Sequence, residues 1–160
     1  MEDIVVRGIA LNRNEAKVTI CDVPDKPGIA AKIFKKIANS NINIDMIIQN
    51  VSRTGYTDVS FTVLSRDIKK TLKITEKVAK QIGAGDLECN GNIAKLSIVG
   101  IGMRSHSGIA SRMFGALARS KINIDMISTS EIKISCVINK KSATKAVRAM
   151  HREFKLGKAI

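Results

Sequence analysis

Residues 28–47 read GIAAKIFKKIANSNINIDMI, and residues 108–127 read GIASRMFGALARSKINIDMI. The last six letters, INIDMI, are identical in the two segments. An uninterrupted identity of this length is hard to obtain by chance, so it indicates an internal duplication. The duplication sets the architecture before any other motif is considered, and we expect two copies of one small α/β module.

The first copy changes its hydrophobic period along the chain. Residues 16–23 (AKVTICDV) alternate apolar and polar side chains, which is typical of a strand. Helical spacing follows in one apolar stripe, made of Ile29, Ile33, Phe34, Ile37 and Ala38. The rest of the pattern predicts strands at 42–51 and 57–64, a helix over about 72–82 and a short strand at 87–89. The order of elements is βαββαβ.

The second copy lacks the last strand of this order. Its patterns predict a strand at 94–101, a helix at about 109–119, a hairpin at 125–138 and a last helix over 143–154. Too few residues follow for a good fourth strand. Residues 4–11 (IVVRGIAL) are strand-like and have no role in the first copy, so we expect them to pair into the second sheet. The alternative is an unpaired N-terminal arm.

This pairing would make the first module an insertion in the second. The expected boundaries are 14–92 for the first module, and 1–13 together with 93–160 for the second. The expected fold class is α+β, with antiparallel sheets and the helices on one face of each. Neither module is then a free domain.

The net charge of +13 raises nucleic acid as a partner. The placement of the lysines favours solvated helix faces instead, because they fall between apolar helix positions. These lysines are Lys32, Lys35, Lys36, Lys69, Lys70, Lys73, Lys77 and Lys80. The chain has no Trp, one Tyr and four Phe to stack on bases. We therefore expect no nucleic-acid partner.

The sequence also bears on the compartment. No apolar run approaches the ~20 residues that span a bilayer, and the N-terminus, MEDIVVRG, is unlike a signal peptide. Cys21, Cys89 and Cys136 lie far apart without CxxC spacing, so we expect neither a disulfide framework nor a zinc site. The expected location is the cytoplasm, with no membrane partner.

No convincing catalytic constellation is present in the sequence. His106 and His151 are widely separated and fit no zinc or triad spacing. Neither a GxxxxGK[ST] nor a complete GxGxxG phosphate loop occurs. We expect no catalytic residue, no metal and no cofactor, and hence a chain that is not an enzyme by itself.

The informative places are the two strand-to-helix turns. Gly28 opens a helix after the first strand, and free N–H groups at a helix start attract carboxylates. Asp25 and Gln49 are acceptors for an ammonium group on the same ligand. The turn around Gly108 repeats the plan, with Ser128–Ser130 where the first copy has residues 48–50. The alternative is that Gly and Pro only form the turn and that no ligand binds there.

Three stretches carry a resemblance to a known family: DKPGIAAKIF (25–34), NINIDMIIQN (41–50) and INIDMISTSEIKIS (122–135). With them the chain resembles the regulatory region of aspartate kinase, in particular its small β subunit, over nearly its whole length. The resemblance implies two ferredoxin-like ACT modules that bind a free amino acid. Further implications are feedback control of lysine, threonine and methionine synthesis by threonine and/or lysine, a homodimer formed through the modules, and a separate kinase catalytic domain or α subunit.

Carried over residue by residue, the resemblance implies two effector sites between modules of different chains. The first, threonine-type site comprises Asp25, Lys26, Pro27, Gly28, Ile29, Ala30 and Gln49, with Asn123 and Ile124 from the facing module. The second comprises Arg104, Ser105, His106, Ser107, Gly108, Ile109 and Ala110, with Asn43, Ile44, Asp45 and Ser52, and with Ser130 and Glu131 close by. The family often has proline where Ser107 stands, so this turn lacks a fixed φ.

The resemblance also implies roles for these groups. The backbone of residues 28–30 would hold the effector's carboxylate, Gln49 its polar side chain or amine, and Asp45 a lysine ammonium. Two other classes stay open at this point. One is a stand-alone ACT sensor of another enzyme, and the other is a basic RNA-binding module, because βαββαβ sheets also bind single strands through exposed aromatics.

Overall fold

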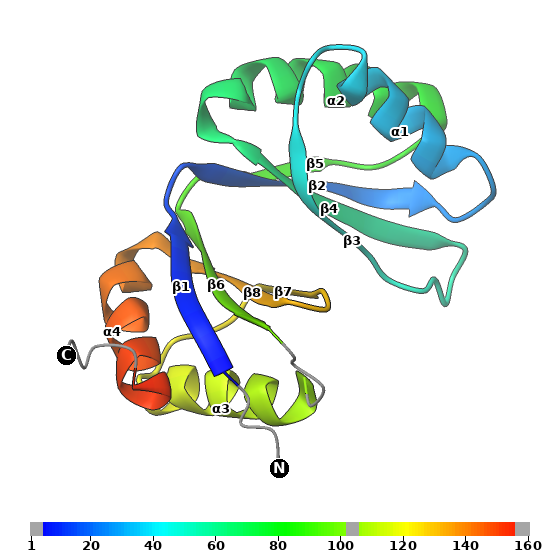
Figure 1. The fold of residues 1–160 in the computed structure, drawn as a ribbon. Helices are drawn as coiled ribbons and strands as arrows, with labels where there is room; N and C mark the ends of the chain where they lie inside the picture. Colours follow the sequence, from blue (N-terminus) through cyan, green and yellow to red (C-terminus); the bar gives the residue numbers. More distant parts are fainter. Residues whose placement is uncertain (1–4, 102–105, 156–160) are drawn as a thin grey trace. The chain divides into compact units, whose positions relative to one another are not determined.

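The structure, a computed structural model, describes residues 5–101 and 106–155 (Figure 1). The chain divides into two compact units. Residues 14–91 form one, which we call the inserted unit, and residues 1–13 with 92–160 form the other, which we call the outer unit. Each unit contains a four-stranded antiparallel sheet, and each is described here by itself.

The inserted unit has the element order expected from its sequence. Its elements are β2 (Glu15–Pro24), α1 (Ile29–Ala38), β3 (Ile44–Gln49), β4 (Tyr56–Leu64), the 3₁₀ turn η1 (Ser65–Asp67), α2 (Ile68–Ile82) and β5 (Leu87–Asn90). The strands lie in the order β3-β4-β2-β5. Both helices cover the same face of this sheet (Figure 1).

Aliphatic side chains hold the helices of the inserted unit on its sheet. The apolar stripe of α1 buries Ile29, Ile33 and Ile37. The ring of Phe34, on the same helix, meets that of the fully buried Phe61 from β4 edge-on, with centroids 5.7 Å apart. Burial of a side chain of this size stabilises the fold by about 1.5–3 kcal/mol. The apolar stripe of α1 therefore holds the helix against the sheet.

The outer unit repeats this plan with a different source for its fourth strand. Its elements are β1 (Val5–Asn12), β6 (Ile93–Ile101), α3 (His106–Arg119), β7 (Met126–Thr129), β8 (Lys133–Asn139), the 3₁₀ turn η2 (Lys140–Ser142) and α4 (Ala143–Phe154). The strands lie in the order β1-β6-β8-β7. Figure 1 shows α3 and α4 covering one face of this sheet.

Strand β1 fills the position in the outer sheet that β5 fills in the inserted one. It pairs with β6 from Val5↔Ile101 to Asn12↔Lys95, with an irregularity between Val6 and Gly8. Val6 is buried in the outer core, and Ile9 and Leu11 pack against that core. The prediction that the N-terminal strand completes the second sheet is thus confirmed, as is the α+β fold class with one module inserted in the other.

The two helix ends that precede the INIDMI segments have the same backbone plan. Asn41 and Lys121 both adopt a positive φ of 57°. The N–H of Ile42 then donates to the carbonyl of Ile37 (3.4 Å), and that of Ile122 to the carbonyl of Leu117 (2.9 Å). Such bonds close a helix by satisfying its last carbonyls. The duplicated sequence therefore produces a duplicated turn, which places each NIDM segment at the start of an edge strand.

Some predicted boundaries differ from the structure. Helix α3 begins at His106, three residues before the predicted start. The predicted strand at 42–51 is shorter, Ile44–Gln49, because the chain before it still belongs to the turn that ends α1. None of the helices in the described residues is long and apolar enough to cross a membrane.

Candidate functional site

The turn between β2 and α1 is shaped by its glycine. Gly28 caps α1 with a φ of 92°, in the left-handed region that glycine adopts without strain. A Cβ at this position would meet nothing within 4 Å, so conformation and not crowding demands glycine. The N–H of Lys32 donates to the Gly28 carbonyl at 3.1 Å. The N–H groups of Ala30 and Ala31 lie before the first hydrogen bond of the helix and have no acceptor within it. Such groups are available to an acceptor from outside the helix.

Sheet topology brings Gln49 to the same end of the inserted unit. Strands β2 and β3 both pair antiparallel with β4, so their last residues lie beside the beginning of β4. Gln49 pairs with Val59 and Val23 with Thr57. The side chains of Asp25, Lys26 and Gln49 are all exposed. The start of α1 with its N–H groups, the carboxylate of Asp25 and the amide of Gln49 are thus all exposed to solvent at the same end of the sheet.

The hairpin loop Asn50–Gly55 is fastened to this turn. The N–H of Asp25 donates to the Gly55 carbonyl at 2.9 Å. The hydroxyl of Thr57 donates to the Asn50 carbonyl at 2.9 Å, and the N–H of Gly55 donates to Ser52 Oγ at 2.7 Å. The sequence patterns identify the hairpin but not the role of Thr57, because threonine is common in strands and nothing in its spacing marks this bond.

The corresponding turn of the outer unit is described in part. Arg104 and Ser105 lie outside the described residues, and so does the side chain of His106. Ser107 and Gly108 are exposed in the first turn of α3, Ile109 is buried and Ala110 is half-buried. On the neighbouring hairpin, Ser130 and Glu131 are exposed, and the N–H of Ser130 donates to the Lys133 carbonyl at 2.8 Å.

The two NIDM segments present the same alternation in both units. Asn43 and Asp45 are exposed and Ile44 is half-buried, and the same holds for Asn123, Asp125 and Ile124. Each segment ends in a buried methionine, Met46 or Met126. The N–H of Met46 donates to the hydroxyl of Thr62 at 3.0 Å, whereas the outer unit has Val137 at the matching place. The polar side chains expected to face an effector are therefore accessible within each unit.

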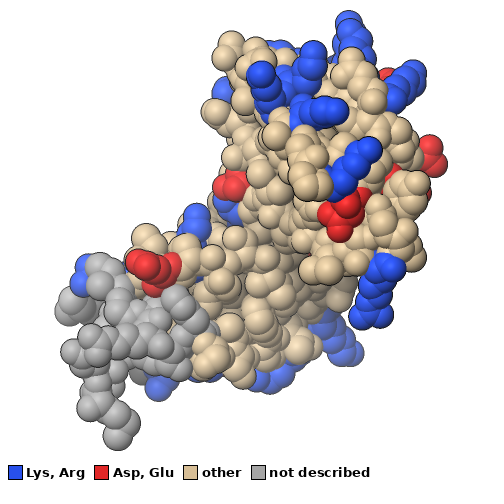
Figure 2. All heavy atoms as spheres, turned by 90° about the vertical axis from the view of Figure 1, so that its right-hand side faces the viewer, with Lys and Arg blue, Asp and Glu red and all other residues tan. Residues whose placement is uncertain are grey.

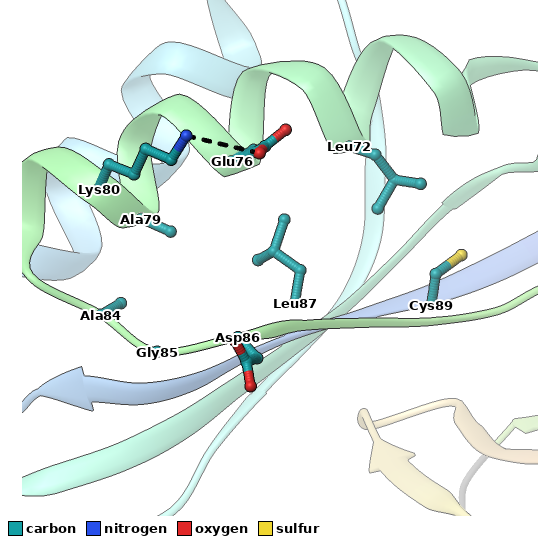
Figure 3. Close-up of a pocket in the computed structure, with 9 residues that line it drawn as sticks. All are labelled: Leu72, Glu76, Ala79, Lys80, Ala84, Gly85, Asp86, Leu87 and Cys89. Atoms are coloured by element: carbon teal, nitrogen blue, oxygen red, sulfur yellow. Dashed lines mark ion pairs between the residues drawn. The ribbon is translucent and has the colours of Figure 1, made fainter.

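A hollow of about 430 Å³ in the inserted unit lies elsewhere, between α2 and β5 (Figure 3). Figure 3 shows Leu72, Ala79 and Leu87 lining it, with the exposed Glu76–Lys80 ion pair (3.6 Å) on α2. None of the residues expected in an effector site belongs to it. The hollow and the candidate site are separate features of the unit.

The thiols are poor nucleophiles. Burial raises the pKa of Cys136 to about 12, and burial also raises the pKa of Cys89. The pKa of Cys21 is raised by burial and then by nearby carboxylates, of which Glu88 contributes most. A thiolate, not a thiol, is the reactive form of cysteine. Within the described residues, moreover, no group of three or more His, Cys, Asp or Glu side chains could hold a metal ion.

Basic side chains cover the helix layer of the inserted unit. Figure 2 shows blue Lys and Arg spheres over the upper part of the view, with tan surface and some red Asp and Glu spheres among them. Lys32, Lys35 and Lys36 on α1 are all exposed. Their spacing along amphipathic helices is that of a solvated face.

Comparison with known protein families identifies the same type of domain in both units. Models of the ACT domain match residues 17–83, in the inserted unit, and residues 96–154, in the outer unit. The fold and the paired helix starts are thus those of a protein with two ACT domains. The aspartokinase of Pseudomonas aeruginosa is 54% identical over 156 residues, which make up 98% of this chain and 38% of that protein.

Two solved structures cover the chain almost end to end. The regulatory subunit of aspartate kinase from Thermus thermophilus, in its ligand-free form, is 40% identical, covers 93% of this chain and 98% of its own, and has a TM-score of 0.88. A chain in the crystal structure of aspartokinase alpha and beta subunits is 46% identical, with coverages of 94% and 99% and a TM-score of 0.88. The chain belongs to the family of aspartate kinase regulatory (β) subunits with two ACT domains.

The resemblance noted in the sequence is therefore confirmed. The chain spans 38% of the length of the curated kinases that it matches. It corresponds to their regulatory portion.

Proposed function

We propose that this chain is the unit through which free threonine and/or lysine inhibits aspartate kinase, and so controls the synthesis of the aspartate-family amino acids. The observation that carries this proposal is the exposed start of α1, where Gly28, Asp25 and Gln49 meet at one end of the inserted sheet. A free amino acid carries a carboxylate and an ammonium on one carbon. The helix start suits the first group, and the neighbouring acceptors suit the second.

In the first site, backbone N–H groups of residues 28–30 would bind the effector's carboxylate. Gln49 would bind its polar side chain or amine, and Asn123 with Ile124 of a second copy would complete the site. The second site would use the turn Arg104–Ala110 with Asn43, Ile44, Asp45 and Ser52 of the other module, and with Ser130 and Glu131 nearby. Its Asp45 carboxylate suits a lysine ammonium, since charge-assisted bonds of this kind give selectivity.

Inhibition requires that effector binding reach the catalytic part. We expect a homodimer formed through the ACT modules, in complex with a kinase domain or α subunit that binds ATP and aspartate. The effector would close two modules on each other and favour one dimer arrangement over another. Coupling of this kind is worth about 1–3 kcal/mol, a roughly 5–150-fold change in affinity.

Thermal unfolding with threonine, lysine, methionine and their pairs tests the proposal. A ligand at a hundred times its dissociation constant adds about 2.7 kcal/mol to the free energy of unfolding. In a chain of this size the midpoint should then rise by several degrees. If a folded, dimeric chain shows no shift with any of these amino acids, effector binding is ruled out.

Ala30→Thr locates the first site. Ala30 is exposed in the first turn of α1, so threonine there adds bulk where the effector should lie without disturbing the core. We expect this variant to lose the thermal shift and, in the assembled enzyme, the inhibition. Ala31→Thr is the matched control, since Ala31 is the next residue of the helix and is also exposed. Full inhibition in the Ala30→Thr enzyme would contradict the placement.

A further inference from the structure

A polar groove lies between the two helices of the outer unit, and we call it the α3–α4 groove. It has a volume of about 300 Å³. Its lining consists of Ala116, Arg119, Ser120, Ala149, Arg152 and Glu153. The two alanines are buried, and their small side chains leave room between the helices. The other four side chains are polar, so a ligand in this groove would meet mainly hydrogen-bond donors.

One of these donors is held in place by a carboxylate. Glu153 accepts from Arg112 Nε at 3.0 Å and from Arg119 Nη2 at 2.9 Å, so both of its oxygens are bonded. Gly115, inside α3, leaves space for this arrangement, because a Cβ there would lie only 3.3 Å from Arg119 Nη1. Glycine weakens a helix interior relative to alanine, and α1 has Lys35 at the matching position. The Arg119 guanidinium is therefore positioned at the groove by its surroundings.

Two other donors of the groove take no part in this contact between the helices. Among the described residues, neither the guanidinium of Arg152 nor the hydroxyl of Ser120 has a hydrogen bond or ion pair. Arg152 is exposed and Ser120 is half-buried. Together with Arg112 and Arg119, three guanidinium groups and the single carboxylate of Glu153 leave a net charge of +2 here. The ion pairs thus explain part of the groove and leave an excess of positive charge and donors.

The inserted unit has a groove at the same place with different chemistry. Its hollow between α1 and α2 measures about 240 Å³. Counted along the duplicated helices, Asn39 matches Arg119, Ser40 matches Ser120, Lys77 matches Arg152 and Val78 matches Glu153. The hydroxyl of Ser40 donates to the Lys36 carbonyl at 3.1 Å, so it is already used. The inserted groove is basic through its lysines, but only the α3–α4 groove combines guanidinium groups with a hydroxyl that has no partner in the described part of the chain.

We propose that the α3–α4 groove binds a phosphate group, with Arg119, Arg152 and Ser120 as donors. Guanidinium groups bind phosphate through paired N–H bonds to two of its oxygens, which an ammonium group does not offer. Two such groups and a hydroxyl suit a doubly charged anion with several oxygens. The site lies at residues other than those of the amino-acid site proposed above, so either can fail without the other. A free phosphate ion and the phosphate end of a nucleotide share this chemistry.

Titration of the whole chain with sodium phosphate at constant ionic strength tests the proposal. Amide NMR should show saturable shifts at residues 119–120 and 149–153. We expect Arg152→Gln to raise the dissociation constant about tenfold, the loss typical of one charge-assisted hydrogen bond. Arg148→Gln is the matched control and should bind as the wild type does. It removes the same charge from an exposed position of α4 that does not line the groove.

A second variant and a second ligand complete the test. Ser120→Ala should weaken phosphate binding severalfold without changing the thermal midpoint in phosphate-free buffer. Titrations with ADP and adenosine distinguish the sources of the phosphate group. If ADP shifts the same amides at lower concentrations than phosphate does, and adenosine shifts none, the ligand is a nucleotide. If ADP binds no better than phosphate, the ligand is the free ion.

Two results would overturn the site. One is the absence of saturable shifts in the α3–α4 groove. The other is an equal loss of binding in Arg152→Gln and Arg148→Gln, with shifts spread over the lysines of both units, which would mean that phosphate only screens a basic surface.

Discussion

Gly28 has a φ of 92°, which an L side chain at the same position can match only with strain. The left-handed region disfavours such residues by about 1–2 kcal/mol. Nothing surrounds the site that a methyl group would strike. The sequence DKPG already predicts a turn here, but the sign of φ and the open space beside it come only from the structure. Side chains nearby, such as Thr57, gain their roles from hydrogen bonds that no spacing rule encodes.

Gly28→Ala should lower the free energy of unfolding by about 1 kcal/mol, because the native φ is strained for alanine. It should also weaken effector binding, since the N–H groups of the first turn would shift. Urea unfolding and the thermal shift with threonine measure the two effects. Gly91→Ala is the control, because Gly91 has open space and no positive φ, and it should change stability by less than about 0.5 kcal/mol. Equal effects in the two variants would contradict the argument from φ.

At the scale of elements, the hydrophobic pattern of the sequence predicts which helices and strands form, and packing decides where they begin and end. Each INIDMI segment follows a helix that ends on a positive-φ residue, and sequence similarity alone predicts both turns. The earlier start of α3 and the shortness of β3 escape prediction because both depend on how a turn closes, not on hydrophobic period. The order of strands follows from the pattern once the N-terminal strand is seen to lack a partner.

Helices α3 and α4 are joined by one carboxylate. Glu153 accepts from Arg112 at 3.0 Å and from Arg119 at 2.9 Å, and the Arg112 guanidinium lies 4.6 Å from the Phe154 ring centre. The glutamate side chain is 23% exposed, while the arginines are 51% and 66% exposed. Solvent screening therefore limits each ion pair to a fraction of a kcal/mol or about 1 kcal/mol.

We expect Glu153→Gln to lower the free energy of unfolding by about 1 kcal/mol at low salt and by less at high salt. Urea titrations at low and high ionic strength measure the difference. Glu76→Gln is the control, because the ion pair of Glu76 with Lys80 at 3.6 Å is exposed and should matter little. A loss in Glu153→Gln that does not change with salt would assign the effect to packing.

At the scale of the whole molecule, the chain has two cores whose sheets share no strand. The inserted unit uses one continuous stretch, and the outer unit needs both ends of the chain. The internal duplication predicts from sequence that the chain divides into two modules. It also predicts that each module has a glycine-containing turn with polar side chains at the start of its first helix. The proposed approach of Asn123 to the turn at Gly28 does not follow from the hydrophobic pattern, because the proposal places Asn123 in a second copy of the chain.

The sequence-based expectation that neither module is a free domain does not extend to the inserted unit. Residues 14–91 expressed alone should fold, because they contain a complete sheet, both of its helices and their core. Residues 93–160 alone should not, since they lack β1 and leave β6 as an unpaired edge over an open core. Amide NMR spectra of the two fragments give the comparison. A dispersed spectrum from 93–160 would mean that β1 is dispensable.

The pairing of β1 with β6 also fixes an order of assembly during translation. Strand β1 leaves the ribosome before the inserted unit, and its partner β6 follows only after the entire inserted unit has been made. The outer core is therefore still incomplete when the inserted unit is already able to fold. Until β6 has been made, no core buries the apolar side chains Val6, Ile9 and Leu11. A nascent chain thus exposes the apolar side chains of β1 while residues 14–91 are being made, and we expect chaperones that bind exposed apolar segments to bind β1 during that interval.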